Sequence, residues 1–221
     1  MKQVEKQTRP IAAGFLAAAA ALALFGYLAR EVWRRQTIRF DASVRDAVHA
    51  WTSPALTYIM TGITWLGSVL VFVALGAVIV WRLLAAGRKH AALILVIAAF
   101  GAELLDQILK LVFQRARPEP FFGLHAMGYS FPSGHTISSC CFYGVLAAIL
   151  TARRRSLLFH VAVWTAAALL SLAIGVSRIY LGVHYPSDVL AGYSAAIIWV
   201  VAVRAGYEIW LKRRRRTSAP E

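Results

Sequence analysis

The chain has 221 residues, 59% of them hydrophobic, and its mean hydropathy is +0.62. These values lie well above those of an ordinary soluble domain, and they exclude a chain that consists only of such a domain. The formal net charge of +14 is a feature that nucleic-acid-binding proteins share. Here, however, the basic residues gather at the ends of hydrophobic segments, which is typical of a membrane protein. We therefore expect a lipid bilayer, and no nucleic acid, as a partner.

Six segments approach or reach the length of about 20 apolar residues that a helix needs to cross a bilayer. They are residues 11–29, 63–81, 91–113, 134–150, 157–176 and 189–210. The sequence thus predicts an all-α fold in which residues 1–221 form one membrane domain of six transmembrane helices. The first segment lacks a clear cleavage site, and we expect it to remain as an anchor rather than to be removed as a signal peptide.

The distribution of charge predicts how the bundle is oriented. Four basic clusters at segment ends fall on one side of a six-span topology, and the positive-inside rule makes that side cytoplasmic, together with both termini. The loop after the first segment departs from this rule because it carries several arginines, which are Arg30, Arg34, Arg35, Arg39 and Arg45. Within this loop, residues 40–51 place apolar side chains on one helical face and are predicted to form a short interfacial helix. A multi-pass protein of the bacterial cytoplasmic membrane is expected.

The third segment carries a stripe of ionisable side chains, which are costly inside a membrane and therefore indicate a functional site. Lys110 and Arg117 are seven residues apart, so one helix face is expected to present both. Asp106 precedes Lys110 by one helical turn and is suited to pair with its ammonium group. Pro118 is expected to end the helix. Taken alone, the stripe is explained equally well by an ion pair that merely holds spans together.

The fourth segment begins with the sequence PSGH, Pro132 to His135. Ser133 and Gly134 form a turn at a helix start, where unpaired N–H groups and the helix dipole favour anions, phosphate in particular. Gly134 also permits a close approach of the backbone to a ligand. Taken alone, the four-residue motif is also compatible with a helix cap and an incidental histidine. His125, which precedes the motif, is expected to be an exposed loop residue.

A third polar group, Arg178, His184 and Asp188, lies between the fifth and sixth segments. A carboxylate that accepts a hydrogen bond from one imidazole nitrogen leaves the other as a nucleophile or base. Because of the topology, the third segment ends, the fourth begins and the fifth ends on the non-cytoplasmic side. The three groups are therefore predicted to meet there. Their cations suit a phosphate or diphosphate ester and would repel a divalent metal ion, so neither a metal nor another cofactor is expected.

Three motifs carry a resemblance to a known family: KLVFQRARP from Lys110, PSGH from Pro132, and SRIYLGVHYPSD from Ser177 to Asp188. Together they resemble the type 2 phosphatidic acid phosphatase superfamily of integral membrane lipid phosphatases. The resemblance implies that His184 is the nucleophile, that Asp188 orients it, and that His135 protonates the leaving oxygen. It further implies that the phosphoryl oxygens are held by Lys110, Arg117, Ser133, Gly134 and Arg178.

The expected function is therefore metal-independent hydrolysis of a phosphorylated or diphosphorylated membrane lipid through a phosphohistidine, with phosphate released on the non-cytoplasmic side. Undecaprenyl diphosphate, phosphatidylglycerophosphate, phosphatidic acid and diacylglycerol diphosphate are candidate substrates. The compact chain most resembles family members that act on the first two. Two alternatives are a phosphate-lipid binding or transport protein without turnover and a vanadate-dependent haloperoxidase, whose soluble nature does not fit six hydrophobic segments.

Overall fold

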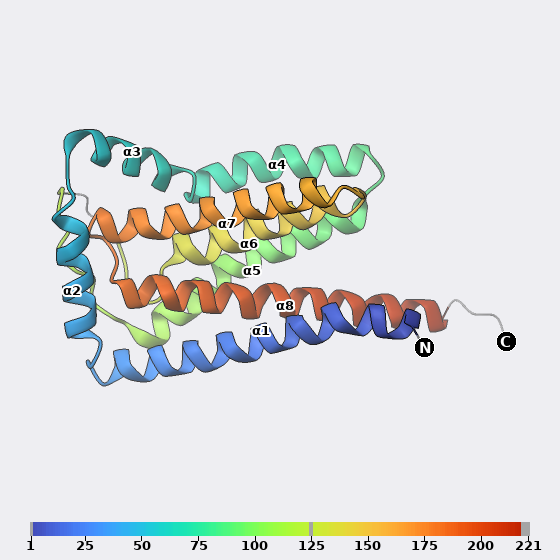
Figure 1. The fold of residues 1–221 in the computed structure, drawn as a ribbon, viewed down its shortest axis with the longest axis horizontal. Coiled ribbons are helices and arrows are strands. Elements are labelled where there is room, and N and C mark those ends of the chain that lie inside the picture. The colour runs from blue at the N-terminus through green and yellow to red at the C-terminus, as the bar shows by residue number, and fades with distance from the viewer. Residues whose placement is uncertain (1, 124–125, 218–221) are drawn as a thin grey trace.

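The computed structural model describes residues 2–123 and 126–217, and every regular element within them is an α-helix (Figure 1). In chain order the helices are α1 Lys2–Trp33, α2 Ile38–His49, α3 Pro54–Trp65, α4 Val69–Ala85, α5 Lys89–Phe113, α6 Gly134–Thr151, α7 Leu157–Tyr180 and α8 Pro186–Thr217. Helices α1 and α4 to α8 run along the long axis of the molecule, whereas α2 crosses one end. The prediction of an all-α membrane bundle is confirmed. His125 lies outside the described residues.

The predicted span at residues 63–81 is wrong at its start. Among the described residues, five helices are long and apolar enough to cross a membrane, and a sixth crossing exists if α3 and α4, bent by 48°, count as one. Ser68 caps α4 by accepting a hydrogen bond from the Val71 N–H. The unpredicted helix α3 begins in the same way, with Ser53 as its cap and Pro54 in the first turn. Hydropathy runs continuously across the break and therefore does not reveal it.

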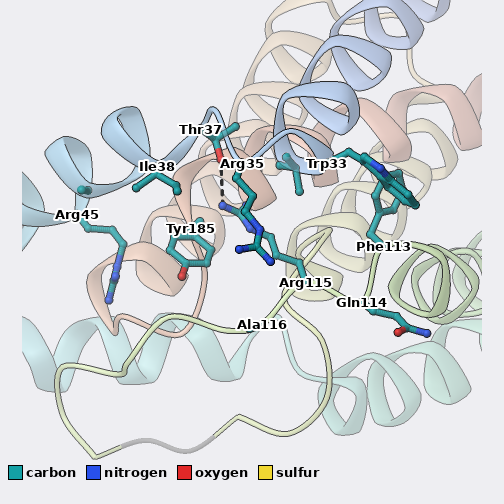
Figure 2. A pocket seen from close by; sticks show the side chains of 12 residues that line it. Trp33, Arg35, Thr37, Ile38, Arg45, Phe113, Gln114, Arg115, Ala116 and Tyr185 are labelled. Carbon is teal, nitrogen blue, oxygen red and sulfur yellow. Dashed lines mark hydrogen bonds between the residues drawn. The ribbon is translucent and has the colours of Figure 1, made fainter.

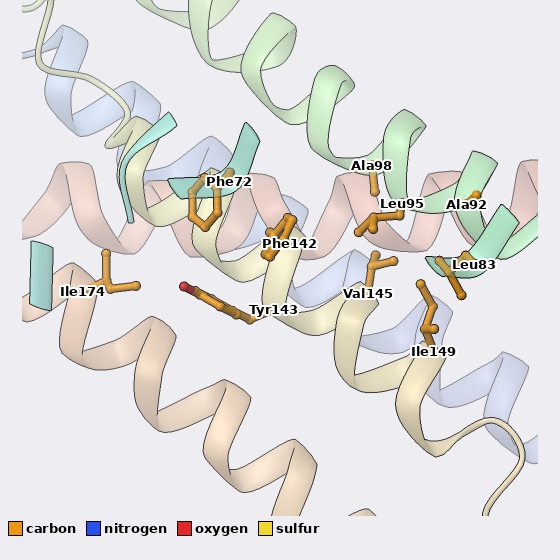
Figure 3. Close-up of a cluster of buried hydrophobic side chains, with 10 residues drawn as sticks. All are labelled: Phe72, Leu83, Ala92, Leu95, Ala98, Phe142, Tyr143, Val145, Ile149 and Ile174. Atoms are coloured by element: carbon orange, nitrogen blue, oxygen red, sulfur yellow. The ribbon is translucent and has the colours of Figure 1, made fainter. Parts of the chain in front are cut away.

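Helix α6 lies at the centre of the bundle and packs against α5, α7 and α8. One apolar cluster joins it to its neighbours through Phe72 of α4, Leu95 of α5 and Ile174 of α7 (Figure 3). Phe142 of α6 lies within this cluster, with its ring centroid 4.9 Å from that of Phe72. Because burial of such side chains is the main stabilising force of a packed core, α6 is fixed along its length. Its first residues, Gly134 and His135 of the PSGH motif, are therefore held in place.

The start of α1 and the end of α8 lie at one end of the bundle, and α2 lies at the other (Figure 1). The end of α5, the start of α6 and the α7–α8 connection all reach the α2 end. The predicted convergence of the three polar groups at one end is thus present. The short helix expected at residues 40–51 corresponds to α2, Ile38–His49. Which compartment each end faces remains a prediction from the charge distribution.

Candidate active site

A cavity of about 250 Å³ at the α2 end brings the three motifs together. It is lined by six of the predicted site residues, which are Lys110, Arg117, Gly134, His135, Arg178 and His184. Ser133 and Asp188 do not line it and are fully buried behind it. Three cations and two histidines therefore share a small space, and that composition suits a ligand with several negatively charged oxygens.

Arg117 does not lie on α5, so the prediction that the helix continues to Pro118 is wrong. The helix ends at Phe113 because Gln114 takes a left-handed backbone conformation, with φ of 45°, and caps it. The irregular segment that follows carries Arg117 into the cavity. Carbonyl oxygens then hold its guanidinium, each at 3.0 Å, and they belong to Met127, Gly128 and Val183.

His184 lies between α7 and α8, and its side chain is 2% exposed. Its Nε2 atom is 3.1 Å from Nη1 of Arg117. A guanidinium can only donate, so Nε2 is the unprotonated nitrogen and Nδ1 carries the proton. Nδ1 faces Oδ2 of Asp188 at 3.4 Å. Burial lowers the pKa of His184 from 6.5 to about 4, so the ring is neutral at pH 7 with an electron pair on Nε2.

The carboxylate of Asp188 is fully buried and surrounded by donors. Its Oδ2 atom accepts hydrogen bonds from the Ser130 hydroxyl and from the backbone N–H of Tyr185. Its Oδ1 atom accepts a hydrogen bond of 2.6 Å from Arg115. A buried carboxylate with this many partners keeps both its charge and its orientation, which is what a residue that directs an imidazole requires.

Arg115 is a residue that sequence reasoning missed. Its Nη1 atom donates to Asp188 and to the Ser187 hydroxyl, and its Nη2 atom donates to Asp41 at 2.7 Å and to the Thr37 hydroxyl. Because a guanidinium presents its N–H groups as a rigid fork, one side chain can bridge the two carboxylates. Arg115 therefore joins the segment after α5 to α2 and to the start of α8.

Asp41 of α2 was also missed, although the sequence holds a signal for it. Its carboxylate is 1% exposed and also accepts hydrogen bonds from the Ser187 N–H and hydroxyl, at 2.9 and 2.8 Å. Asp41 precedes Val44 by three residues and Val48 by seven, so it shares their face of the helix. A carboxylate on the apolar face of an interfacial helix indicates a buried partner, and here that partner is Arg115.

The predicted pair of Asp106 and Lys110 is confirmed, with Oδ2 and Nζ 2.6 Å apart. The Asp106 carboxylate packs directly against Gly134, where an added Cβ atom would lie 2.5 Å from Oδ2. Glycine at this position is therefore required by the carboxylate that aims Lys110. Within the described part of the chain, Oδ1 of Asp106 is buried without a hydrogen-bond partner.

Arg178 reaches the cavity from the last turn of α7 and is 9% exposed. Its Nη1 atom donates a hydrogen bond of 2.6 Å to the hydroxyl of Thr64, near the end of α3. Its Nε atom is buried with no hydrogen-bond partner among the described residues. The break between α3 and α4 thus has a role at the site, because it brings Thr64 against Arg178.

Ser133 contributes to the helix start rather than to the cavity wall. Its N–H donates to the carbonyl oxygen of Asp188 at 3.0 Å, and its hydroxyl accepts a hydrogen bond from Thr136. Gly134 and His135 occupy the first positions of α6, where N–H groups have no acceptor within the helix. The backbone at the cavity wall is therefore suited to contact an anion.

Residues 91–211 match the family described as the PAP2 superfamily. Phosphatidylglycerophosphatase B of Bacillus subtilis is 34% identical over 178 residues, which cover 80% of this chain and 87% of that relative. The chain belongs to the PAP2 superfamily. The membership that the three motifs predicted, under the family's longer name of type 2 phosphatidic acid phosphatases, is thereby confirmed.

Two solved structures resemble most of the bundle. The crystal structure of a transmembrane PAP2-type phosphatidylglycerolphosphate phosphatase from Bacillus subtilis has a TM-score of 0.78 at 28% identity, over 86% of this chain and 96% of that one. The crystal structure of Aquifex aeolicus LpxE has a TM-score of 0.57 at 25% identity, over 75% and 95%. This PAP2 protein is accordingly a multi-pass membrane lipid phosphatase, as the sequence predicted.

Proposed function

We propose that the protein hydrolyses the terminal phosphate monoester of phosphatidylglycerophosphate through a covalent phosphohistidine at His184. The observation that carries the mechanism is the state of His184, a neutral imidazole whose unprotonated Nε2 faces the cationic cavity while Nδ1 points at Asp188. The substrate assignment rests on the name of the Bacillus subtilis relative, which this chain matches over most of the length of both. The alternative substrate is undecaprenyl diphosphate.

In the first step, Nε2 of His184 attacks phosphorus while the bond between phosphorus and the lipid oxygen breaks. His135, in its protonated form, gives its proton to the leaving lipid oxygen. Arg117 turns its N–H from Nε2 to a phosphoryl oxygen as the new bond forms. Lys110 and Arg178 neutralise the remaining oxygens, together with the first N–H groups of α6, because phosphoryl transfer depends chiefly on positioning and charge stabilisation.

In the second step, a water molecule attacks phosphorus of the phosphohistidine and the phosphorus–nitrogen bond breaks. His135, neutral after the first step, accepts a proton from this water and returns to its starting form. Asp188 accepts the Nδ1–H hydrogen bond throughout, so the positive charge that develops on His184 in the first step is stabilised. Inorganic phosphate then leaves on the non-cytoplasmic side.

An apolar groove next to the cavity supports a lipid as the substrate. The groove has a volume of about 520 Å³ and lies between α4, α5 and α6, where Phe72 and Phe100 are among its lining residues. It shares Val69, Glu103 and Ser138 with the phosphate cavity. A phosphate group in the cavity would therefore extend directly into an apolar groove that suits an acyl chain.

Metal independence is part of the proposal. The cavity is lined by three cationic side chains and two carboxylates, and its excess of positive charge opposes binding of a divalent cation. The cations are Lys110, Arg117 and Arg178, and the carboxylates are Glu103 and Asp106, of which Asp106 is paired with Lys110. We expect a chelator to leave the rate of phosphate release unchanged.

The test is phosphate release by detergent-solubilised protein from phosphatidylglycerophosphate, undecaprenyl diphosphate, phosphatidic acid and diacylglycerol diphosphate, side by side. Wild type should act fastest on the first lipid, and His184→Ala should release none while eluting from a sizing column like wild type. Mass spectrometry of rapidly quenched protein should find a phosphoryl group on His184 in wild type. Turnover by His184→Ala, or its loss with a chelator, would refute the mechanism. Preference for another lipid would refute only the substrate assignment.

A further inference from the structure

A second cavity, of about 790 Å³, lies at the same end of the bundle and shares no lining residue with the candidate active site. It opens between the end of α1, the start of α2 and the segment after α5, and Figure 2 shows the side chains that line it. Three of these are arginines, namely Arg35, Arg45 and Arg115. None of the described residues that line it is acidic.

Two of the three arginines bring positive charge that no carboxylate balances. Arg115 is neutralised by its bonds to Asp41 and Asp188. Arg35 and Arg45, by contrast, form no ion pair within residues 2–123 and 126–217. A cavity with uncompensated cations attracts an anion, and the attraction is strongest at Arg45, whose partial burial limits screening by water.

Arg45 is held in place but is left with an unsatisfied group. Its Nη2 atom donates to the carbonyl oxygen of Glu119 at 2.7 Å, and its Cζ atom lies 4.7 Å from the centre of the Phe121 ring. Its Nε atom is buried without a hydrogen-bond partner in the described part of the chain. Such a group is costly in a folded protein unless a ligand or solvent satisfies it.

Apart from the polar side chains of Thr37 and Gln114, the remaining walls of this cavity consist of apolar and aromatic residues, several of which lie at the ends of helices. Trp33, 71% exposed, ends α1, and Phe113 ends α5, while Val32 and Ile38 add aliphatic surface. Tryptophan at a helix end of a membrane protein typically lies at the level of the lipid headgroups. The cavity therefore combines cations with apolar side chains at the depth where a phospholipid presents its phosphate and its first acyl carbons.

We propose that this cavity binds an anionic phospholipid, with the lipid phosphate between Arg35 and Arg45 and the glycerol and acyl carbons against Trp33 and Phe113. The apolar walls and the volume, about three times that of the catalytic cavity, favour a lipid over free phosphate. The proposal also explains why the loop after α1 carries arginines on the side of the membrane where the positive-inside rule disfavours them. It does not depend on the identity of the substrate.

The test is native mass spectrometry of the purified full chain with phosphatidylglycerol and, separately, with phosphatidylcholine. Wild type should retain phosphatidylglycerol preferentially. The variant Arg35→Gln/Arg45→Gln should bind it about 30-fold more weakly, which corresponds to about 1 kcal/mol for each basic residue at an anionic surface. Arg34→Gln/Arg39→Gln is the matched control, because it removes the same charge from exposed residues at the same end that do not line the cavity.

Three results would overturn the proposal: equal losses in the two double variants, equal retention of the two lipids by wild type, or complete displacement of the lipid by millimolar inorganic phosphate. Equal losses would mean that net charge alone attracts the lipid. Displacement by phosphate would mean that the cavity binds free anions rather than a lipid. If the double variant does not fold, Arg35→Gln alone replaces it. The Arg35 side chain is exposed, and its loss should weaken binding about fivefold.

Discussion

Arg115 and Asp188 are joined by a hydrogen bond of 2.6 Å although 73 residues separate them in the chain. Through its other terminal nitrogen, Arg115 also binds Asp41 of α2. The carboxylate that faces His184 is thus held by a side chain that is itself anchored to a helix at the end of the bundle. Arg115 does not line the phosphate cavity, and we infer that it is a positioning residue, which acts on the proposed reaction through Asp188.

Arg115→Lys should lower kcat about 10- to 100-fold with little change in KM. An ammonium keeps the charge but lacks the fork that bridges two carboxylates, and hydrogen bonds to charged groups each contribute about 1.5–3 kcal/mol. Steady-state kinetics on phosphatidylglycerophosphate measure this. Arg34→Lys, at an exposed arginine of the same end, is the control and should behave like wild type. A rise in KM at unchanged kcat would instead place Arg115 in substrate binding.

Gly134→Ala should reduce kcat/KM about 100-fold, comparable with the loss of one oxyanion-type donor. The added methyl group would lie 2.5 Å from Oδ2 of Asp106, so that carboxylate and the Lys110 it holds must move. Gly144→Ala, in the same helix but with nothing within 4 Å of its added Cβ, is the control and should keep full activity. Activity of Gly134→Ala near that of wild type would mean that Lys110 does not depend on this contact.

Thr64→Val should reduce kcat/KM about tenfold or more. The substitution keeps the shape of the side chain but removes the hydrogen-bond acceptor from Nη1 of Arg178, a bond to a charged group that contributes about 1.5–3 kcal/mol. Thr61→Val on the same helix provides the comparison. If both variants lose activity equally, the effect belongs to α3 as a whole and not to Arg178.

The dependence of kcat/KM on pH should show an acidic limb with an apparent pKa near 4, after separate titration of the substrate's own phosphate. Burial lowers the pKa of His184 to about 4, so the nucleophile stays neutral at pH values where an ordinary imidazole is protonated. An acidic limb whose apparent pKa equals that of an ordinary imidazole would contradict the assignment of buried, neutral His184 as the nucleophile.

The lowered pKa of His184 also makes the free energy of unfolding depend on pH. Between pH 6.5 and about 4, the unfolded chain binds a proton at His184 that the folded protein does not. The free energy of unfolding therefore falls as the pH drops through this window, by up to about 3 kcal/mol, and this loss is absent above pH 6.5. His184→Gln should lose less stability than wild type over the same window.

The meeting of Lys110, His135 and His184 could be predicted from the sequence because topology alone decides it. The number of crossings and the positions of the motifs at segment ends determine which residues reach the same end. The pairing of Asp106 with Lys110 was equally accessible, since a spacing of four residues is a local property of a helix.

The contacts of Arg115 could not be predicted in the same way. They depend on the end of α5 at Phe113, where Gln114 takes a left-handed conformation. Glycine is the usual residue at such a position, so the sequence does not indicate that the helix ends there. They depend also on the docking of α2, a tertiary contact between residues 74 positions apart. The break before α4 was missed for a related reason. An added Cβ atom at Gly67 would lie 2.6 Å from Ile174, so close packing requires glycine there, but hydropathy does not register packing.

The bond between Arg115 and Asp41 also imposes an order on how the enzyme is made. Asp41 is synthesised early, with the first loop, whereas Ser187 and Asp188 belong to the last helix. The carboxylate of Asp188 gains its partners only when that last helix has been inserted and α2 has docked. We therefore expect catalytic competence to be the final event of biogenesis. A nascent chain that stops before residue 186 carries all three cations and both histidines of the cavity but lacks the carboxylate of Asp188 that orients His184.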